Sequence, residues 1–230
     1  MVRKEVITIL AVVLFSGNGL YAVPDKIFTS SGHILPGEEW ANVFIYNDGT
    51  IVNMLGGDVD GIATYDSSMV NVTGGFVSTL DALEFSIANI SGGTVGGVMT
   101  WDYAITNLYD GGSVFSLSAR GQSGVVNMAG GITEYLRAGE SGIINLYGGV
   151  VTNCLDTWDS ATVNIYGYGF NYDPSAGGWD GGQLTGFWLD DSSFAIDLYD
   201  PDTYEHINLV PEPCSLILLA FGSLAMIRKR

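Results

Sequence analysis

Three basic side chains could take part in lyase chemistry in the central chain. Lys26, Arg120 and Arg137 are the only Lys or Arg residues between positions 23 and 209. Elimination on a uronate polymer needs an Arg or Lys base and cations that hold the substrate carboxylates. Arg120 and Arg137 stand 13 and 10 residues after equivalent asparagines of a repeat described below. This spacing does not define a constellation, so we interpret both as solvated corner residues.

Hydrolysis of a glycoside would instead need two carboxylates placed across a sugar. Asp58 with Asp60, and Asp190 with Asp191, are the candidates. Their clustering has no specificity in a chain with 25 acidic residues. We interpret them as solvated loop residues and predict no catalytic residue and no enzyme.

Oxygen ligands for Ca²⁺ are also available, at Asp200, Asp202 and Glu205 or at Asp190 with Asp191. No spacing matches a calcium-binding loop, so Ca²⁺ remains an open option without a motif and we predict no cofactor. His33 and His206 stand far apart in sequence, and nothing in the Cys and His spacing points to zinc.

The aromatic side chains leave one further option, a ligand- or ion-binding face built from exposed Tyr, Trp and Asp. Its tryptophans would include Trp101, Trp158, Trp179 and Trp188.

A repeat must position all of these groups. Its unit is an apolar residue, Asn, a second apolar residue, one variable position and Gly-Gly, which in the fourth copy comes one place late. The asparagines are Asn53, Asn71, Asn89, Asn107, Asn127, Asn145 and Asn164. They stand 18, 18, 18, 20, 18 and 19 residues apart, which predicts a coil of nearly constant length.

A second register supports the coil. Nine residues after each Asn, or ten in the coil of Asn107, comes an aliphatic residue or cysteine. These residues are Ile62, Leu80, Val98, Leu117, Leu136 and Cys154. Units of this size must stack to bury their apolar faces, and stacked asparagines can hydrogen-bond along a ladder. We therefore predict an all-β, single-stranded parallel β-helix of about seven coils, with two or three strands per coil and Cys154 in a buried column. A right-handed coil is favoured because no hexapeptide period is found.

Domain boundaries follow from the repeat. Residues 51–170 form the β-helix, and residues 23–50 form an N-terminal cap. Residues 171–209 form a C-terminal β cap, in which strands near 187–189, 194–198 and 207–210 would make a hairpin-type element. A disulfide within the body is not expected, because the second cysteine, Cys214, lies beyond it.

The two ends of the chain carry targeting patterns. Arg3 and Lys4 precede an apolar run over residues 6–15, and residues 1–22 have the layout of a signal peptide. At the other end, Pro211, Glu212 and Pro213 precede an apolar run over residues 214–227 and a basic terminus. A helix of that length rises only about 21 Å, short of the roughly 30 Å hydrocarbon core, so it would anchor the chain weakly.

Residues 210–230 resemble the PEP-CTERM sorting signal, a tail also named the ice-binding protein C-terminal domain. The resemblance implies recognition of Pro211, Glu212 and Pro213 by an exosortase-type membrane protease. It also implies delivery to the envelope, outer surface or extracellular matrix of a Gram-negative-type bacterium, with residues 214–227 in the membrane before processing. The body lacks the Thr-x-Thr array that ice binding would need.

The net charge of the body limits the classes of partner that it can bind. The body, residues 23–209, has three basic residues and 23 acidic ones, since only Glu5 and Glu212 lie outside it, which gives a formal charge of −20. Such a surface repels nucleic acid. We predict an exported, non-enzymatic protein with a structural or adhesive role in an exopolysaccharide matrix, with matrix polysaccharide as a partner. The alternatives are a β-helix carbohydrate-active enzyme, lyase or hydrolase, and a surface module that binds carbohydrate or ions.

Overall fold

The computed structural model describes residues 22–211, and most of this chain is β-strand. The predicted signal segment except for its last residue, Glu212, Pro213 and the apolar run 214–227 lie outside the described residues. Within residues 22–211, no helix is long and apolar enough to cross a membrane.

The described chain contains fifteen strands and one short 3-10 helix, η1 (Pro201–His206). The strands are β1 (Lys26–Phe28), β2 (Gly32–Ile34), β3 (Glu39–Ile45), β4 (Ile51–Met54), β5 (Asp58–Thr64), β6 (Met69–Ala82), β7 (Ile87–Thr100), β8 (Ile105–Leu108), β9 (Ser113–Ala119), β10 (Val125–Ala138), β11 (Ile143–Thr157), β12 (Thr162–Asp173), β13 (Gln183–Phe187), β14 (Ser193–Asp197) and β15 (Ile207–Pro211).

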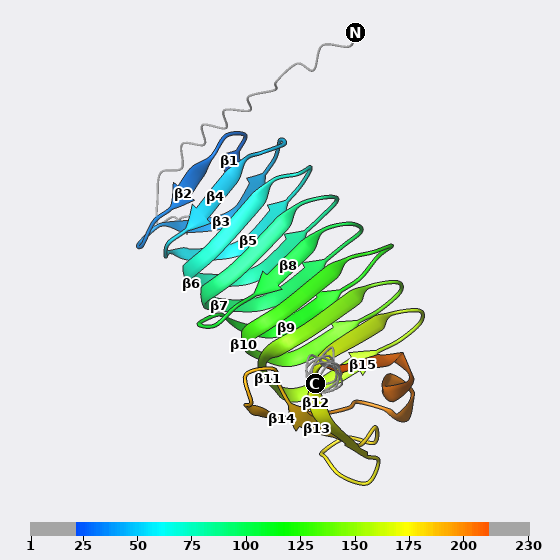
Figure 1. The fold of residues 1–230 in the computed structure, drawn as a ribbon. Helices are drawn as coiled ribbons and strands as arrows, with labels where there is room; N and C mark the ends of the chain where they lie inside the picture. The colour runs from blue at the N-terminus through cyan, green and yellow to red at the C-terminus, as the bar shows by residue number, and fades with distance from the viewer. Residues whose placement is uncertain (1–21, 212–230) are drawn as a thin grey trace, which may run out of the picture.

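These strands wind into a parallel β-solenoid, which confirms the predicted fold (Figure 1). From Asn53 to Asn164, each asparagine of the repeat is in register with the asparagine of the next coil. Every pairing among β1–β12 is parallel, as expected for coils that advance in one direction. The handedness of the coil stays a prediction.

Each coil has three sides around one apolar core. The first side contains Asn, the second follows the Gly-Gly corner, and the third leads to a turn that ends in a small residue such as Ser68, Ser86 or Ala104. On the first side inward and outward residues alternate strictly. Between the second and third sides the inward positions are three residues apart, as at Val77 and Leu80, so the strand bends there. Ser68 and Ser86 are fully buried beside the turn after the third side, at the corner where small residues were expected.

The Gly-Gly corner depends on one position, four residues after Asn. Glycine occupies it with positive φ in the six coils from Gly57 to Gly149. In the coil of Asn107 that glycine is Gly111, so the corner itself is not displaced. Asp110 stands where the other coils have the first glycine, and Gly112 is the inserted residue. The Gly-Gly pair of this coil therefore comes one residue later in the sequence because Asp110 replaces the first glycine and Gly112 is inserted after the second.

The aliphatic columns lie in the core, with one correction. Ile62, Leu80, Val98, Leu117 and Leu136 follow one another in register. The next member is Leu155 and not Cys154, which pairs with Tyr135. The prediction for Cys154 was wrong in register because β11 contains one extra residue between Val151 and Cys154. Both Cys154 and Leu155 are nevertheless buried.

The segment predicted as an N-terminal cap is itself a coil of the solenoid. Strands β1, β2 and β3 pair in parallel with β3, β4 and β5, respectively. His33 takes the register position of the asparagine, beside Asn53. Because His33 replaces the asparagine and Pro36 replaces the first glycine, the Gly-Gly repeat does not reveal this coil.

The solenoid ends where the corner glycine is missing. Four residues after Asn164 stands Tyr168, so β12 does not turn and continues to Asp173. There it pairs antiparallel with β13, and β13 pairs antiparallel with β14. The third strand expected in this cap, 207–210, is not part of that antiparallel sheet. It is β15, which pairs in parallel with β12 and sets Asn208 beside Asn164.

Candidate binding surfaces

The asparagines form a continuous hydrogen-bonded ladder on the outer surface of the first side. From Asn71 to Asn164, each Nδ2 donates to Oδ1 of the asparagine in the preceding coil at 2.8–2.9 Å. Asn208 adds a further rung by donating to Asn164 at 3.2 Å. The sequence analysis missed Asn208, although Ile207-Asn208-Leu209 has the apolar-Asn-apolar pattern. It stands 44 residues after Asn164 and lacks the glycines that follow the other asparagines.

The ladder lies in the middle of a surface without charged residues. We define the Asn face as each asparagine from Asn53 to Asn164 together with the residues two before and two after it, all of which point outward. None of these positions holds Asp, Glu, Lys, Arg or His. The body elsewhere has a formal charge of −20, and the outward column of the third side contains Asp81, Arg137 and Asp156. The Asn face is therefore chemically distinct from the rest of the solenoid.

The Asn face presents both polar and apolar groups to a ligand. A side-chain amide has two N–H donors and two acceptor lone pairs on its oxygen, so each interior rung keeps one donor and one lone pair free. The column before the ladder is mainly aliphatic, as at Ile87 and Ile105. The column after it ends in Tyr147 and Tyr166, whose rings stack with centroids 4.4 Å apart. Such a surface can contact both the hydroxyl groups and the apolar ring faces of a carbohydrate.

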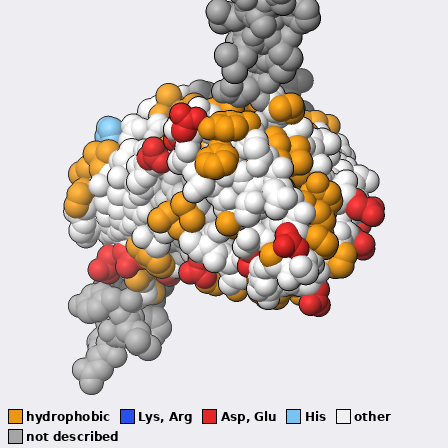
Figure 2. Space-filling model, turned by 60° about the horizontal axis from the view of Figure 1, so that its bottom comes forward, with side chains coloured by type: hydrophobic (Ala, Val, Ile, Leu, Met, Phe, Trp, Pro, Cys, Tyr) orange, Lys and Arg blue, Asp and Glu red, His pale blue; other side chains and the backbone are white. Residues whose placement is uncertain are grey.

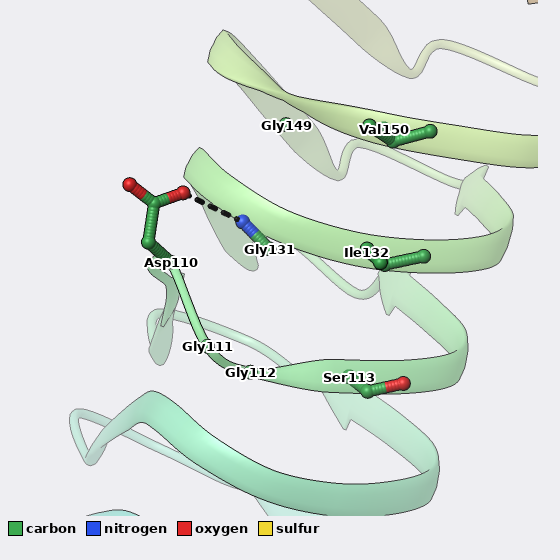
Figure 3. Close-up of a pocket in the computed structure, with 8 residues that line it drawn as sticks. All are labelled: Asp110, Gly111, Gly112, Ser113, Gly131, Ile132, Gly149 and Val150. Carbon is green, nitrogen blue, oxygen red and sulfur yellow. Dashed lines mark hydrogen bonds between the residues drawn. The ribbon is translucent and has the colours of Figure 1, made fainter.

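A shallow groove continues the Asn face around the Gly-Gly corner (Figure 3). Its volume is about 360 Å³, and glycines form much of its floor. Ile132 and Val150 line one wall and are about half exposed. At the other edge, the Asp110 carboxylate accepts a hydrogen bond from Gly131 N at 3.3 Å. The groove spans three successive coils, and the first of them is the coil where Asp110 replaces the first corner glycine.

The molecular surface also exposes many apolar side chains. Figure 2 shows one face on which hydrophobic side chains gather in groups, with acidic side chains among them and at the rim. Among the described residues, no Lys or Arg side chain is visible on that face. The presence of acidic side chains and the lack of visible basic ones on this face agree with the acidic composition of the body.

No protein-family model, no curated protein and no solved structure matches this chain. The arrangement of its own residues therefore has to support any functional proposal.

The structure does not pair the acidic candidates across a binding cleft. Asp58 and Asp60 are exposed on β5 near the start of the solenoid, whereas Asp190 and Asp191 lie in the turn between β13 and β14. Asp190 accepts hydrogen bonds from Ser192, which lower the pKa of its carboxyl group. Among the described residues, no group of three or more His, Cys, Asp or Glu side chains is placed to hold a metal ion.

The calcium candidates near the C-terminal cap have structural contacts. Oδ1 of Asp200 accepts hydrogen bonds from the Thr203 backbone and hydroxyl, both at 2.9 Å, and so caps η1. Asp202 lies in the first turn of that helix. His206 contacts the Ala161 carbonyl oxygen through Nδ1 at 3.0 Å.

The tryptophans do not share one face. Trp188 is 4% exposed and packs on Phe194, so its interpretation as a ligand-binding residue was wrong. Trp179 donates to Asn153 at 3.0 Å near the C-terminal cap. Trp101 and Trp158 lie on either side of Arg120, at the end of the third side.

Arg120 and Arg137, which we expected to be solvated corner residues, lie on neighbouring coils of the third side. Arg137 is in register with Ser118, two residues before Arg120. Both guanidinium groups are partly buried, because Nε of each arginine is shielded from solvent and has no hydrogen-bond partner. Arg137 nevertheless keeps 37% of its side-chain surface exposed, so both arginines are partly solvated, as expected, and partly buried.

Cys154 is an unreactive thiol in the folded protein. It is a free cysteine with 1% exposure. Burial raises its pKa to about 11, and the nearby Asp156 carboxylate adds to the effect. The thiol is therefore protonated at neutral pH.

Proposed function

We propose that this protein is an exported surface or extracellular-matrix protein that acts as a rigid, non-enzymatic adhesive element and holds matrix polysaccharide on its Asn face. The observation that supports the proposal is the uncharged, regularly repeated Asn face on an otherwise strongly acidic body. Hydroxyl groups of a sugar chain can bond to the free amide donors and acceptors while its apolar ring faces contact the aliphatic and tyrosine columns.

The solenoid suits this role mechanically. Neighbouring coils are joined by backbone hydrogen bonds on three sides and by the asparagine ladder, so the face is held flat by the same interactions that form the fold. A ligand surface held in this way loses little conformational entropy on binding. Repetition of one contact in successive coils also lets a long polymer bind through many weak contacts at once.

A charge placed on the Asn face tests the binding proposal. Ile87→Glu puts a carboxylate between Met69 and Ile105, where a sugar chain would have to desolvate it. We expect binding to insoluble polysaccharide from the producing cells, and to cellulose as a defined uncharged polymer, to weaken about tenfold, or roughly 1.4 kcal/mol. Cosedimentation measures this change.

Thr94→Glu is the matched control, because Thr94 is exposed on the second side of the same coil and the substitution adds the same charge. Equal weakening by the two variants would contradict binding through the Asn face.

The export proposal rests on the two terminal patterns and has its own test. Pro211, the first residue of the Pro-Glu-Pro motif, is the last residue of β15. In the producing cells, we expect the wild-type protein to lose its C-terminal residues and leave the membrane. With Pro211 and Pro213 both replaced by alanine, we expect the chain to keep Arg230 and stay in the membrane. Intact mass and cell fractionation distinguish these results, and identical behaviour of the two forms would contradict the sorting proposal.

A further inference from the structure

Two of the three basic residues in the described body lie on neighbouring coils of the third side, although the body is strongly acidic. Arg120 follows β9, and Arg137 lies on β10 in register with Ser118. The third basic residue, Lys26, lies in the first coil and is 3.6 Å from Glu38. The guanidinium of Arg137 lies over the ring of Tyr135, with its Cζ 4.9 Å from the ring centroid.

Aromatic rings flank Arg120. Its Cζ lies 4.9 Å from the ring centroid of Trp158 and 5.9 Å from that of Trp101. Gly139 separates Arg120 from Trp158 along the stack of coils, and a Cβ atom there would come within 2.3 Å of the Trp158 ring. The missing side chain at Gly139 therefore allows Trp158 to reach Arg120. We call Trp101, Arg120, Arg137, Asp156 and Trp158 the Arg–Trp cluster.

The donors of both guanidinium groups are left without hydrogen bonds to the protein. Each guanidinium has five N–H donors, and within residues 22–211 neither the Arg120 nor the Arg137 guanidinium donates a hydrogen bond to the protein. The nearest carboxylate oxygen, Oδ2 of Asp156, lies 4.0 Å from Nε of Arg137, which is too far for a hydrogen bond. Nε of both arginines is also shielded from water. The terminal N–H groups of the two guanidinium groups are not shielded in this way, so they are available to an acceptor supplied from outside.

One carboxylate of the protein, Asp156, interacts electrostatically with both arginines. Burial raises the pKa of Asp156, while Arg137 and, more weakly, Arg120 lower it and Asp200 raises it. Asp200 is engaged as the cap of η1.

We propose that the Arg–Trp cluster binds the carboxylate of an acidic sugar. Guanidinium groups bind carboxylates through paired, charge-assisted hydrogen bonds, and indole rings pack against the apolar face of a pyranose. This site lies on the third side and is separate from the Asn face. The protein would thus bind an anionic sugar at this site in addition to the uncharged polymer that the proposed function assigns to the Asn face.

The surrounding charge limits the size of the ligand. Exposed Asp102, Glu140 and Asp159 lie in the turns that follow the cluster residues. They repel a polyanion that runs along the solenoid. The ligand is therefore one or two acidic sugars, such as a uronate at a chain end or branch.

Tryptophan fluorescence of the full-length protein tests the proposal, because two of its indoles flank the site. Digalacturonate should quench the fluorescence to saturation, whereas neutral digalactose, inorganic phosphate and sulfate should not. Arg120→Gln and Arg137→Gln should each weaken digalacturonate binding about tenfold or more. Lys26→Gln, which removes a distant cation, should leave it unchanged.

Three results would overturn the proposal. If digalactose bound equally well, the carboxylate would not be needed. If phosphate bound equally well, the cluster would be a general anion site. If both arginine variants bound digalacturonate as the wild type does, the site would lie elsewhere. If Arg120→Gln unfolds, as judged by circular dichroism, Arg137→Gln still decides the outcome because Arg137 has no tryptophan partner. Ile87→Glu should bind digalacturonate normally, so failure of the Asn face and failure of this site are distinguishable.

Discussion

Gly75→Ala is expected to destabilise the protein by about 3–5 kcal/mol, the largest effect of a single methyl group that the fold predicts. Gly75 turns the Gly-Gly corner with a φ of 87°. The left-handed region alone costs an L-residue roughly 1–2 kcal/mol. An added Cβ would also lie 2.5 Å from the carbonyl oxygen of Gly57, which is backbone of the preceding coil and cannot rotate away. Urea denaturation followed by circular dichroism measures the change.

Gly97→Ala is the control for that experiment. Gly97 lies in the next coil, its φ is not positive, and a Cβ there would meet no atom within 4 Å. Alanine should stabilise this position slightly or leave it neutral, by about 0–1 kcal/mol, because glycine loses more backbone entropy on folding. If both substitutions had similar effects, the corner would not depend on a left-handed glycine.

Asn107→Ala is expected to cost about 1–3 kcal/mol, because it interrupts the ladder at its centre. The change removes the hydrogen bond to Asn89 at 2.8 Å and the one from Asn127 at 2.9 Å. It also leaves an oxygen on one neighbour and an N–H group on the other without their partners. The half-buried position limits how well water can replace them. Thermal or urea denaturation is again the measurement.

Asn208→Ala provides the comparison at the end of the ladder. Asn208 is exposed and makes one ladder bond, to Asn164 at 3.2 Å. Water can replace that bond, so we expect a loss below about 0.5–1 kcal/mol. Equal losses at Asn107 and Asn208 would contradict a ladder that acts as a connected unit.

The two proposed surfaces have different origins in the sequence. The Asn face repeats the same residue type in every coil, so its existence follows from the period. The Arg–Trp cluster occurs once, where β9 and β10 meet, and depends on the absent side chain of Gly139. A repeating surface suits a polymer, whereas a single cluster suits one sugar unit.

The sequence by itself determined the parallel solenoid, the asparagine ladder and most of the aliphatic core column. These features depend on a period of 18–20 residues, and a period survives folding because coils of equal length stack in register. Where a coil gains a residue, counting from the nearest asparagine fails. This is why Cys154 was placed in the column that Leu155 occupies.

Only the tertiary structure decided where the chain leaves and rejoins the solenoid and which non-repeating side chains meet. Tyr168 replaces the corner glycine and sends β12 into the antiparallel hairpin, after which Asn208 returns to the ladder. The relative position of Arg120 and Arg137 on the third side follows from backbone pairing between β9 and β10. Counting residues from the nearest asparagine does not show this. The physical reason is that each repeat unit contains the residues for its own repeated contacts. A contact that occurs only once depends instead on the number of residues in every coil that separates its two partners.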